Sequence, residues 1–149
     1  MNGQKGMTIA ELVVAIAAAG IIVVFLGTSI YQIFNVSGYG NDRLTATHEL
    51  ENAAHWFNTD GQGAKAATGG ATLALTMTDN SSITYTRAGT DLCRTTGGDE
   101  IILARNITSA NFTIDARVVT MSLTSSPPGG YGVSASGTYH VYLRPGESG

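Results

Sequence analysis

The chain opens with MNGQKGMTIAELVVAIAAAGIIVVFLGTSIYQIF (residues 1–34), and this stretch decides how the rest of the protein is placed. It contains a single acid, Glu11, and the next charged side chain along the chain is Asp42. As an α-helix, residues 12–34 would be about 35 Å long, enough to cross a hydrocarbon core of roughly 30 Å. The sequence therefore predicts one membrane-spanning helix near the N-terminus.

A cleaved secretory signal peptide is the other interpretation of this apolar run. Such a signal has a shorter apolar core, about 7–15 residues, followed by a small-residue cleavage site. Residues 35–38 (NVSG) are only a weak match to that site, so an inserted helix is favoured. Lys5 precedes the span and the next basic residue is Arg43, which predicts a cytoplasmic N-terminus and an extracytoplasmic chain from about residue 36.

The residues around the start of the span resemble the signal of type IV prepilins and type II secretion pseudopilins. A short leader containing Lys5 ends at Gly6, Met7 follows, and Glu11 stands four residues further on. In that family prepilin peptidase cleaves after the glycine, and the new first residue is N-methylated. The resemblance therefore implies cleavage between Gly6 and Met7, methylation of Met7 and a role for Glu11 in assembly. Met7 is a departure, because the family most often has phenylalanine there.

The charge of Glu11 also needs a physical explanation, since charged groups in lipid are costly. Cleavage after Gly6 would create an α-amine with a reference pKa near 7.7–8.0, four residues from Glu11. Pairing the two charges offsets much of the cost of either one. The spacing allows a pair within one chain, whereas the resemblance implies a pair between neighbouring filament subunits. A helix-end acid that reaches toward the interface is the remaining interpretation.

Two glycines, Gly20 and Gly27, interrupt the apolar run. Each costs about 1 kcal/mol relative to alanine in a helix interior. The resemblance implies that part of this helix unwinds in filaments, which makes both glycines candidates for helix flexibility, Gly20 above all. Close packing between membrane helices is the other interpretation.

The remainder of the chain predicts an amphipathic helix followed by strands. Residues 37–41 (SGYGN) are expected to weaken the helix before it resumes, and Asn41 can cap the part that follows, which ends near residues 60–63. An apolar stripe at helical spacing predicts that this second helix lies on a sheet; it comprises Leu44, Thr47, Leu50, Ala54 and Phe57. Beyond Gly70 the apolar residues alternate in short runs separated by turn residues, as in an antiparallel meander.

We therefore expect an α+β fold in which a long N-terminal helix, half membrane-spanning and half amphipathic, packs on a C-terminal antiparallel β-sheet, as in pilins. The expected regions are a leader at 1–6, a transmembrane and assembly helix at 7–36, an amphipathic helix at 37–59 and a β-rich head at 60–149. The strand succession, including Ile83 to Tyr85 and Tyr139 to Arg144, is similar to minor pilins and J-type minor pseudopilins.

Other candidate sites have simpler interpretations. His48, Glu51 and His55 share a helix face and are interpreted as solvated, and Asp91, Asp99 and Glu100 as turn residues that bind no calcium. Cys93, the only cysteine, is expected to be a buried apolar side chain. The net charge of −3 and the lack of a basic cluster argue against a nucleic-acid partner. With no nucleophile–base spacing, phosphate loop or zinc motif, we expect neither an enzyme nor a cofactor.

The expected function is that of a structural subunit, minor by its resemblance, of a type IV pilus or pseudopilus filament. The implied partners are other pilin or pseudopilin subunits, prepilin peptidase, an inner-membrane platform protein and an assembly ATPase. The subunit would sit in the inner membrane before assembly and in an extracytoplasmic or cell-surface filament afterwards. Pilus, secretion pseudopilus and DNA-uptake system share these features. A single-span anchored binding module that never polymerises is the alternative, and a membrane-tethered enzyme lacks a supporting site.

Overall fold

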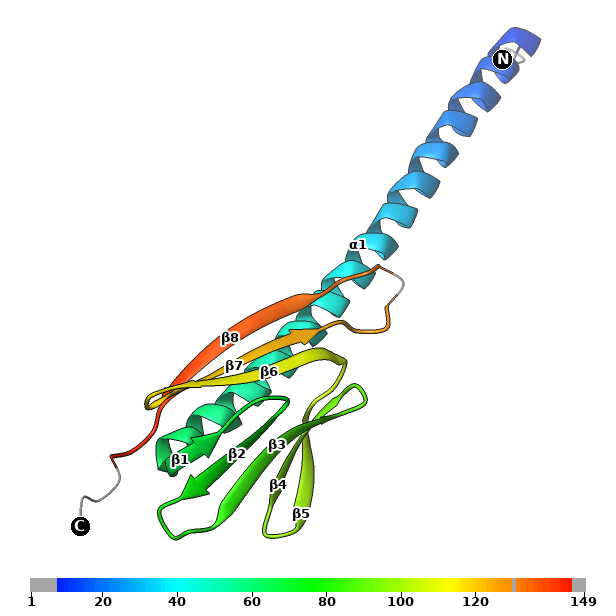
Figure 1. The fold of residues 1–149 in the computed structure, drawn as a ribbon. Helices are drawn as coiled ribbons and strands as arrows, with labels where there is room; N and C mark the ends of the chain where they lie inside the picture. The colour runs from blue at the N-terminus through cyan, green and yellow to red at the C-terminus, as the bar shows by residue number, and fades with distance from the viewer. Residues whose placement is uncertain (1–7, 130, 146–149) are drawn as a thin grey trace, which may run out of the picture. The chain divides into compact units, whose positions relative to one another are not determined.

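A computed structural model describes residues 8–129 and 131–145 of the chain (Figure 1). The predicted cleavage site, Gly6 and Met7, lies outside the described residues. The chain divides into two compact units, and the boundary lies between Gly38 and Tyr39. The second unit, from Tyr39 onward, contains the strands and is called the head below.

The predicted long N-terminal helix, with its apolar and amphipathic halves, is one continuous element, α1 (Ile9–Gly63). The expected weakening at residues 37–41 does not break the helix, which continues through Gly38 and Gly40. Asn41 is therefore an interior residue and not a cap. Each glycine costs only about 1 kcal/mol, and no proline occurs nearby, so helical hydrogen bonding propagates across this stretch. The helix ends at Gly63, at the close of the predicted stop sequence.

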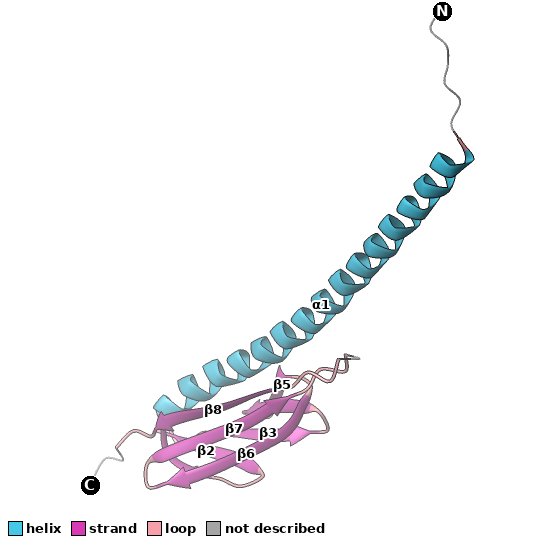
Figure 2. Cartoon of the chain, turned by 90° about the horizontal axis from the view of Figure 1, so that it is seen from above, coloured by secondary structure: helices cyan, strands magenta, loops and turns pink. Residues whose placement is uncertain are grey.

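Strands follow the helix directly and form two antiparallel sheets (Figure 2). Within the described residues the first sheet has the order β1-β2-β3-β4-β5 and the second has the order β6-β7-β8. The strands are β1 (Ala64–Thr68), β2 (Thr72–Met77), β3 (Ser82–Ala88), β4 (Asp91–Thr96), β5 (Asp99–Ala104), β6 (Ile107–Asp115), β7 (Val118–Ser125) and β8 (Ala135–Tyr142). The α+β prediction of a long helix on antiparallel strands is confirmed.

Two features of the sheets were not predicted. The alanine-rich strand β1 lacks the β-branched and aromatic residues that indicate strands, so its sequence gives little signal. The division of the strands between two sheets is equally hidden, because both sheets show the same alternation of buried and exposed positions.

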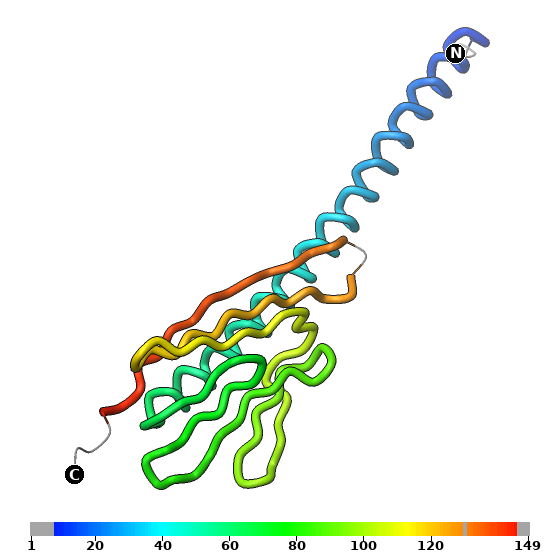
Figure 3. The backbone as a smooth tube through the Cα atoms, viewed as in Figure 1, coloured from blue at the N-terminus to red at the C-terminus, as the bar shows by residue number. Residues whose placement is uncertain are grey.

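The second half of α1 lies along both sheets, as the backbone trace in Figure 3 shows. Its buried residues are Ala46, Leu50, Ala53, Phe57, Asp60 and Gly61. The predicted stripe is right for Leu50 and Phe57 but wrong for Leu44 and Thr47, which are exposed. The buried face instead recurs at three- and four-residue spacing from Ala46 to Asp60, and it packs into one core with residues of both sheets.

Candidate functional site: the N-terminal helix and its docking on the sheets

Glu11 lies in the first turn of α1, where it forms a reciprocal cap with Thr8. The Thr8 backbone N–H and the Thr8 hydroxyl each donate to Glu11 Oε2 over 2.9 Å. In return, the Glu11 backbone N–H donates to Thr8 Oγ1 over 3.3 Å. This is the Thr-x-x-Glu capping box, which satisfies backbone groups that a helix start otherwise leaves unpaired. Sequence reasoning missed this intrachain role of Glu11, although the spacing was visible.

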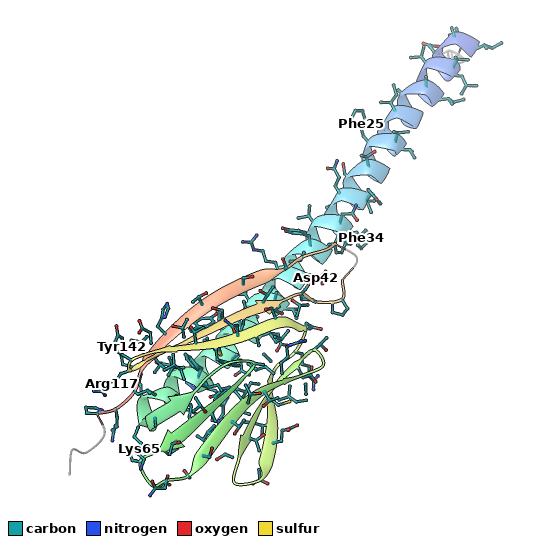
Figure 4. All side chains as sticks on the ribbon, viewed as in Figure 1. Phe25, Phe34, Asp42, Lys65, Arg117 and Tyr142 are labelled. Atoms are coloured by element: carbon teal, nitrogen blue, oxygen red, sulfur yellow. The ribbon has the colours of Figure 1, made fainter. Side chains whose placement is uncertain are left out.

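Downstream of Glu11 the helix is apolar on every side. Its most apolar 18-residue window has a mean hydropathy of 2.8, and none of that window is buried. Phe25 and Phe34, both 70% exposed, extend freely from this part of α1 (Figure 4). A helix that is hydrophobic all round is typical of a membrane span or a helix bundle. By length and composition, α1 can therefore cross a membrane.

Gly20 and Gly27 lie within this part of α1 without interrupting it. A Cβ added at either glycine would meet no atom of the described residues within 4 Å. Neither glycine is needed for a close contact inside this subunit, so their role in helix flexibility stays a prediction for the assembled state.

The last turn of α1 docks on the first sheet through a buried ion pair. Arg94 of β4 donates from Nε to Asp60 Oδ2 over 2.6 Å and from Nη2 to Asp60 Oδ1 over 2.9 Å. The Tyr85 hydroxyl of β3 donates to Asp60 Oδ2 over 2.5 Å. Tyr85 and Arg94 face each other across the β3–β4 ladder, so the sheet presents both donors together. A two-point Arg–carboxylate pair also fixes orientation, and here it sets how the helix end sits on the sheet.

Aromatic rings surround this ion pair. The Arg94 guanidinium carbon lies 4.9 Å from the centroid of the Trp56 ring, one turn before Asp60 on α1. Phe57 meets the Tyr85 ring edge-on at a centroid distance of 6.4 Å. Burial and the hydrogen bond to Asp60 raise the pKa of Tyr85 far above its usual value. The hydrogen bonds to Asp60 likewise raise the pKa of Arg94, so both groups hold their protons in the folded head.

Two glycines at the end of α1 allow the close approach to the strands. A Cβ on Gly61 would lie 2.3 Å from Cγ1 of Val141 on β8. A Cβ on Gly63 would lie 2.7 Å from the terminal methyl of Met77 on β2. The first contact is to a short branched side chain with little freedom to move, so Gly61 is required by packing.

Two further polar contacts hold α1 about two to three turns before Asp60, at the end of β5. The Asn52 side-chain amide donates to the Leu103 carbonyl over 2.5 Å. The Arg105 backbone N–H donates to Glu49 Oε2 over 2.6 Å. The helix is thereby held both at Arg94 of β4 and at the end of β5.

The remaining candidates are the histidines on α1, the acids near β4 and β5, and Cys93. Asp91, Asp99 and Glu100 are strand residues of β4 and β5 and not turn residues, so that interpretation is wrong. His48 Nδ1 lies 3.6 Å from Glu51 Oε2 on an exposed face, and the His55 ring meets Trp56 edge-on. In the described part of the chain, no three His, Cys, Asp or Glu side chains cluster as metal ligands would. Cys93 is buried as predicted, and burial together with Glu100 raises the pKa of its thiol.

The sequence did not reveal the residues that dock α1 on the sheet, Asp60 and Arg94, because each also fits its own helix end or strand. Asp60 was interpreted as part of a helix-stop sequence, although it follows Phe57 by three residues on the buried face. Arg94 has the same strand parity as Leu92, which was a visible sign that it points inward. Comparisons of the chain with protein-family models, with curated proteins and with solved structures find no match.

Proposed function

We propose that this chain is a structural subunit of a type IV pilus or pseudopilus filament, cleaved between Gly6 and Met7 and polymerised through α1. One observation carries the proposal: a lone acid, Glu11, opens a fully exposed apolar helix directly after the Gly6–Met7 signal. The same helix continues without a break into the head, where it is fixed by the Asp60–Arg94 pair.

In this function the first half of α1 is the polymerisation element. It spans the inner membrane before assembly and packs with the helices of other pilin or pseudopilin subunits afterwards. Its apolar side chains leave lipid for an equally apolar bundle, so packing and charge pairing direct the association. The carboxylate of Glu11 pairs with the new amine of Met7 on a neighbouring subunit. Prepilin peptidase, a platform protein and an assembly ATPase supply the processing and the energy.

A second candidate, a membrane-anchored module that never polymerises, is favoured by the capping box. Thr8 already gives the Glu11 carboxylate a local use, and a helix cap requires no neighbouring subunit. The two candidates differ in what they require of Glu11: the filament needs its charge, whereas the cap needs only a hydrogen-bond acceptor.

Two glutamate variants separate these requirements. Glu11→Gln keeps the capping box, because glutamine also serves at this position, but it removes the charge. Glu11→Ala removes both. A filament subunit predicts that the two variants lose incorporation equally in a sheared-filament fraction, while membrane levels and cleavage after Gly6 stay normal by mass spectrometry. Incorporation of Glu11→Gln at the wild-type level would show that Glu11 acts only as a helix cap. A mature chain that begins near residue 38 would reject the filament function.

A further inference from the structure

The two sheets of the head have four edge strands, β1, β5, β6 and β8, and these differ in what lies beside them. Gly70, between β1 and β2, exchanges backbone hydrogen bonds of 2.9 and 3.1 Å with Phe112 of β6. The Arg144 backbone N–H also donates to the carbonyl of Ala64 on β1. Among the described residues, no backbone hydrogen bond from another segment reaches the outer edge of β5 or of β8. Such edges present backbone N–H and C=O groups that another strand can pair with.

Only part of the β5 edge is open. Its end is covered by α1, since Asn52 binds the Leu103 carbonyl and Glu49 binds the Arg105 N–H. Residues 99–102 are exposed, and they include two consecutive isoleucines, Ile101 at 41% and Ile102 at 46% exposure. The same four residues begin with two acids, Asp99 and Glu100. The open part of β5 is therefore short, apolar and negatively charged.

The β8 edge is open beside a groove. Two adjoining hollows of about 570 and 500 Å³ lie between α1 and β8 and share Glu51 and Tyr139. Leu50 and Phe57 line them from the helix with apolar surface. The final part of β8 carries His140 and exposed Tyr142, and Arg144 follows it. Figure 4 shows Tyr142 and Arg117 at this end of the head.

We propose that residues 99–102 of one copy pair in antiparallel fashion with the open edge of β8 in a second copy. The inference rests on the proposed filament function and names a contact between heads within it. Antiparallel pairing with Ile102 opposite Thr138 places the Glu100 carboxylate opposite the His140 imidazole, which can donate a hydrogen bond to it, and Arg144 follows further along the chain. It also places an isoleucine of β5 over the apolar groove beside Tyr139.

The charges select this pairing over the symmetric one. Two β5 edges placed together would bring four carboxylates into one short contact that contains no basic residue among residues 99–102. A β5–β8 contact instead joins two different edges, so every copy keeps one edge free for the next. Head-to-tail contacts of this kind build open helical assemblies and not closed dimers. The contact therefore requires several adjacent copies in the filament, in contrast to a subunit present once.

Cysteine cross-linking in membranes and sheared filaments containing the full chain tests the contact. The double variant Ile102→Cys/Thr138→Cys places one thiol on each edge, while native Cys93 is buried. With a short bis-maleimide we expect a ladder of dimers, trimers and higher species from the double variant. Each single variant should stay monomeric. The matched control Ser82→Cys/Thr138→Cys, with its first thiol on an inner strand, should give no ladder.

Charge reversal gives a second measurement on the double-cysteine chain. Glu100→Arg should lower the cross-linked yield, and adding His140→Glu, at the position opposite it in the Ile102–Thr138 register, should restore it. A cross-linked dimer formed efficiently by Ile102→Cys alone would show a symmetric contact and overturn the proposal. A chain that is cleaved after Gly6 and incorporated but gives no ladder would also overturn it, while leaving the filament function intact. A ladder from chains that are never cleaved would uphold the edge contact and reject the proposed filament function.

Discussion

The two halves of α1 share one helical backbone but differ in what surrounds them. Up to Gly38, apolar side chains cover the whole circumference, and the most apolar window has no buried residue. From Tyr39 to Gly63 only one face is apolar, and it is buried against the strands together with a carboxylate. The first half therefore needs lipid or other helices, whereas the second half finds its partners within the chain. This difference predicts that substitutions in the second half alone change the stability of the head.

The largest effect is expected from breaking the Asp60–Arg94 pair. Asp60→Ala leaves the Arg94 guanidinium buried without its carboxylate, which should cost about 3–5 kcal/mol of unfolding free energy. Trp56, the only tryptophan, lies on Arg94 and reports the loss by fluorescence during urea unfolding of the detergent-solubilised full chain. The control Asp60→Leu/Arg94→Met removes both charges and should recover much of the loss. Equal stability of Asp60→Ala and wild type would show that the pair does not fix the helix.

A smaller loss is expected at the close contact between Gly61 and Val141. Gly61→Ala introduces a Cβ 2.3 Å from Val141 Cγ1, and overpacking of this kind costs about 1–3 kcal/mol. Val141→Ala removes the obstructing methyl groups, so the double variant should show a favourable coupling energy in a double-mutant cycle. Additive losses would mean that the helix end moves away from β8 without strain.

The hydrogen bond from Tyr85 predicts a pH dependence. Tyr85 loses its proton at a higher pH in the folded head than in the unfolded chain, where its pKa is about 10. Its stabilising contribution is therefore complete below about pH 10 and is lost as the pH rises further; the raised pKa of Arg94 acts in the same direction. Tyr85→Phe should lower stability by about 1.5–3 kcal/mol at neutral pH and flatten the decline above pH 10. If the stability of Tyr85→Phe falls above pH 10 as steeply as that of the wild type, the pH dependence comes from another group, such as Tyr139, whose pKa is also raised by burial.

The smallest effect is expected in the first half of α1. Gly20→Ala adds a Cβ that meets no atom within 4 Å, so the unfolding free energy of the head should change by less than about 0.5 kcal/mol. The same Trp56 measurement serves here. A loss comparable to that of Gly61→Ala would contradict the independence of the two halves.

The sequence by itself determined the features that depend on local composition and spacing. An uninterrupted apolar run predicts a long exposed helix wherever it occurs, and period-two alternation predicts strands such as β2, β3 and β7. The lone acid before the run was equally visible, although its capping bond to Thr8 was overlooked. These properties follow from each segment's own residues, so no knowledge of the packing was required to find them.

Tertiary structure decided which local tendencies prevailed. The glycines at 38 and 40 suggested a weakened helix, yet the continuous helix carries Leu50, Phe57 and Asp60 into one core. Asp60 and Arg94 are 34 residues apart, and the pairing of β3 with β4 brings Tyr85 to the same carboxylate. The division of the strands into two sheets depends in the same way on contacts between distant segments. A buried charge is tolerated only where its partners are already in place, and that condition depends on the whole fold.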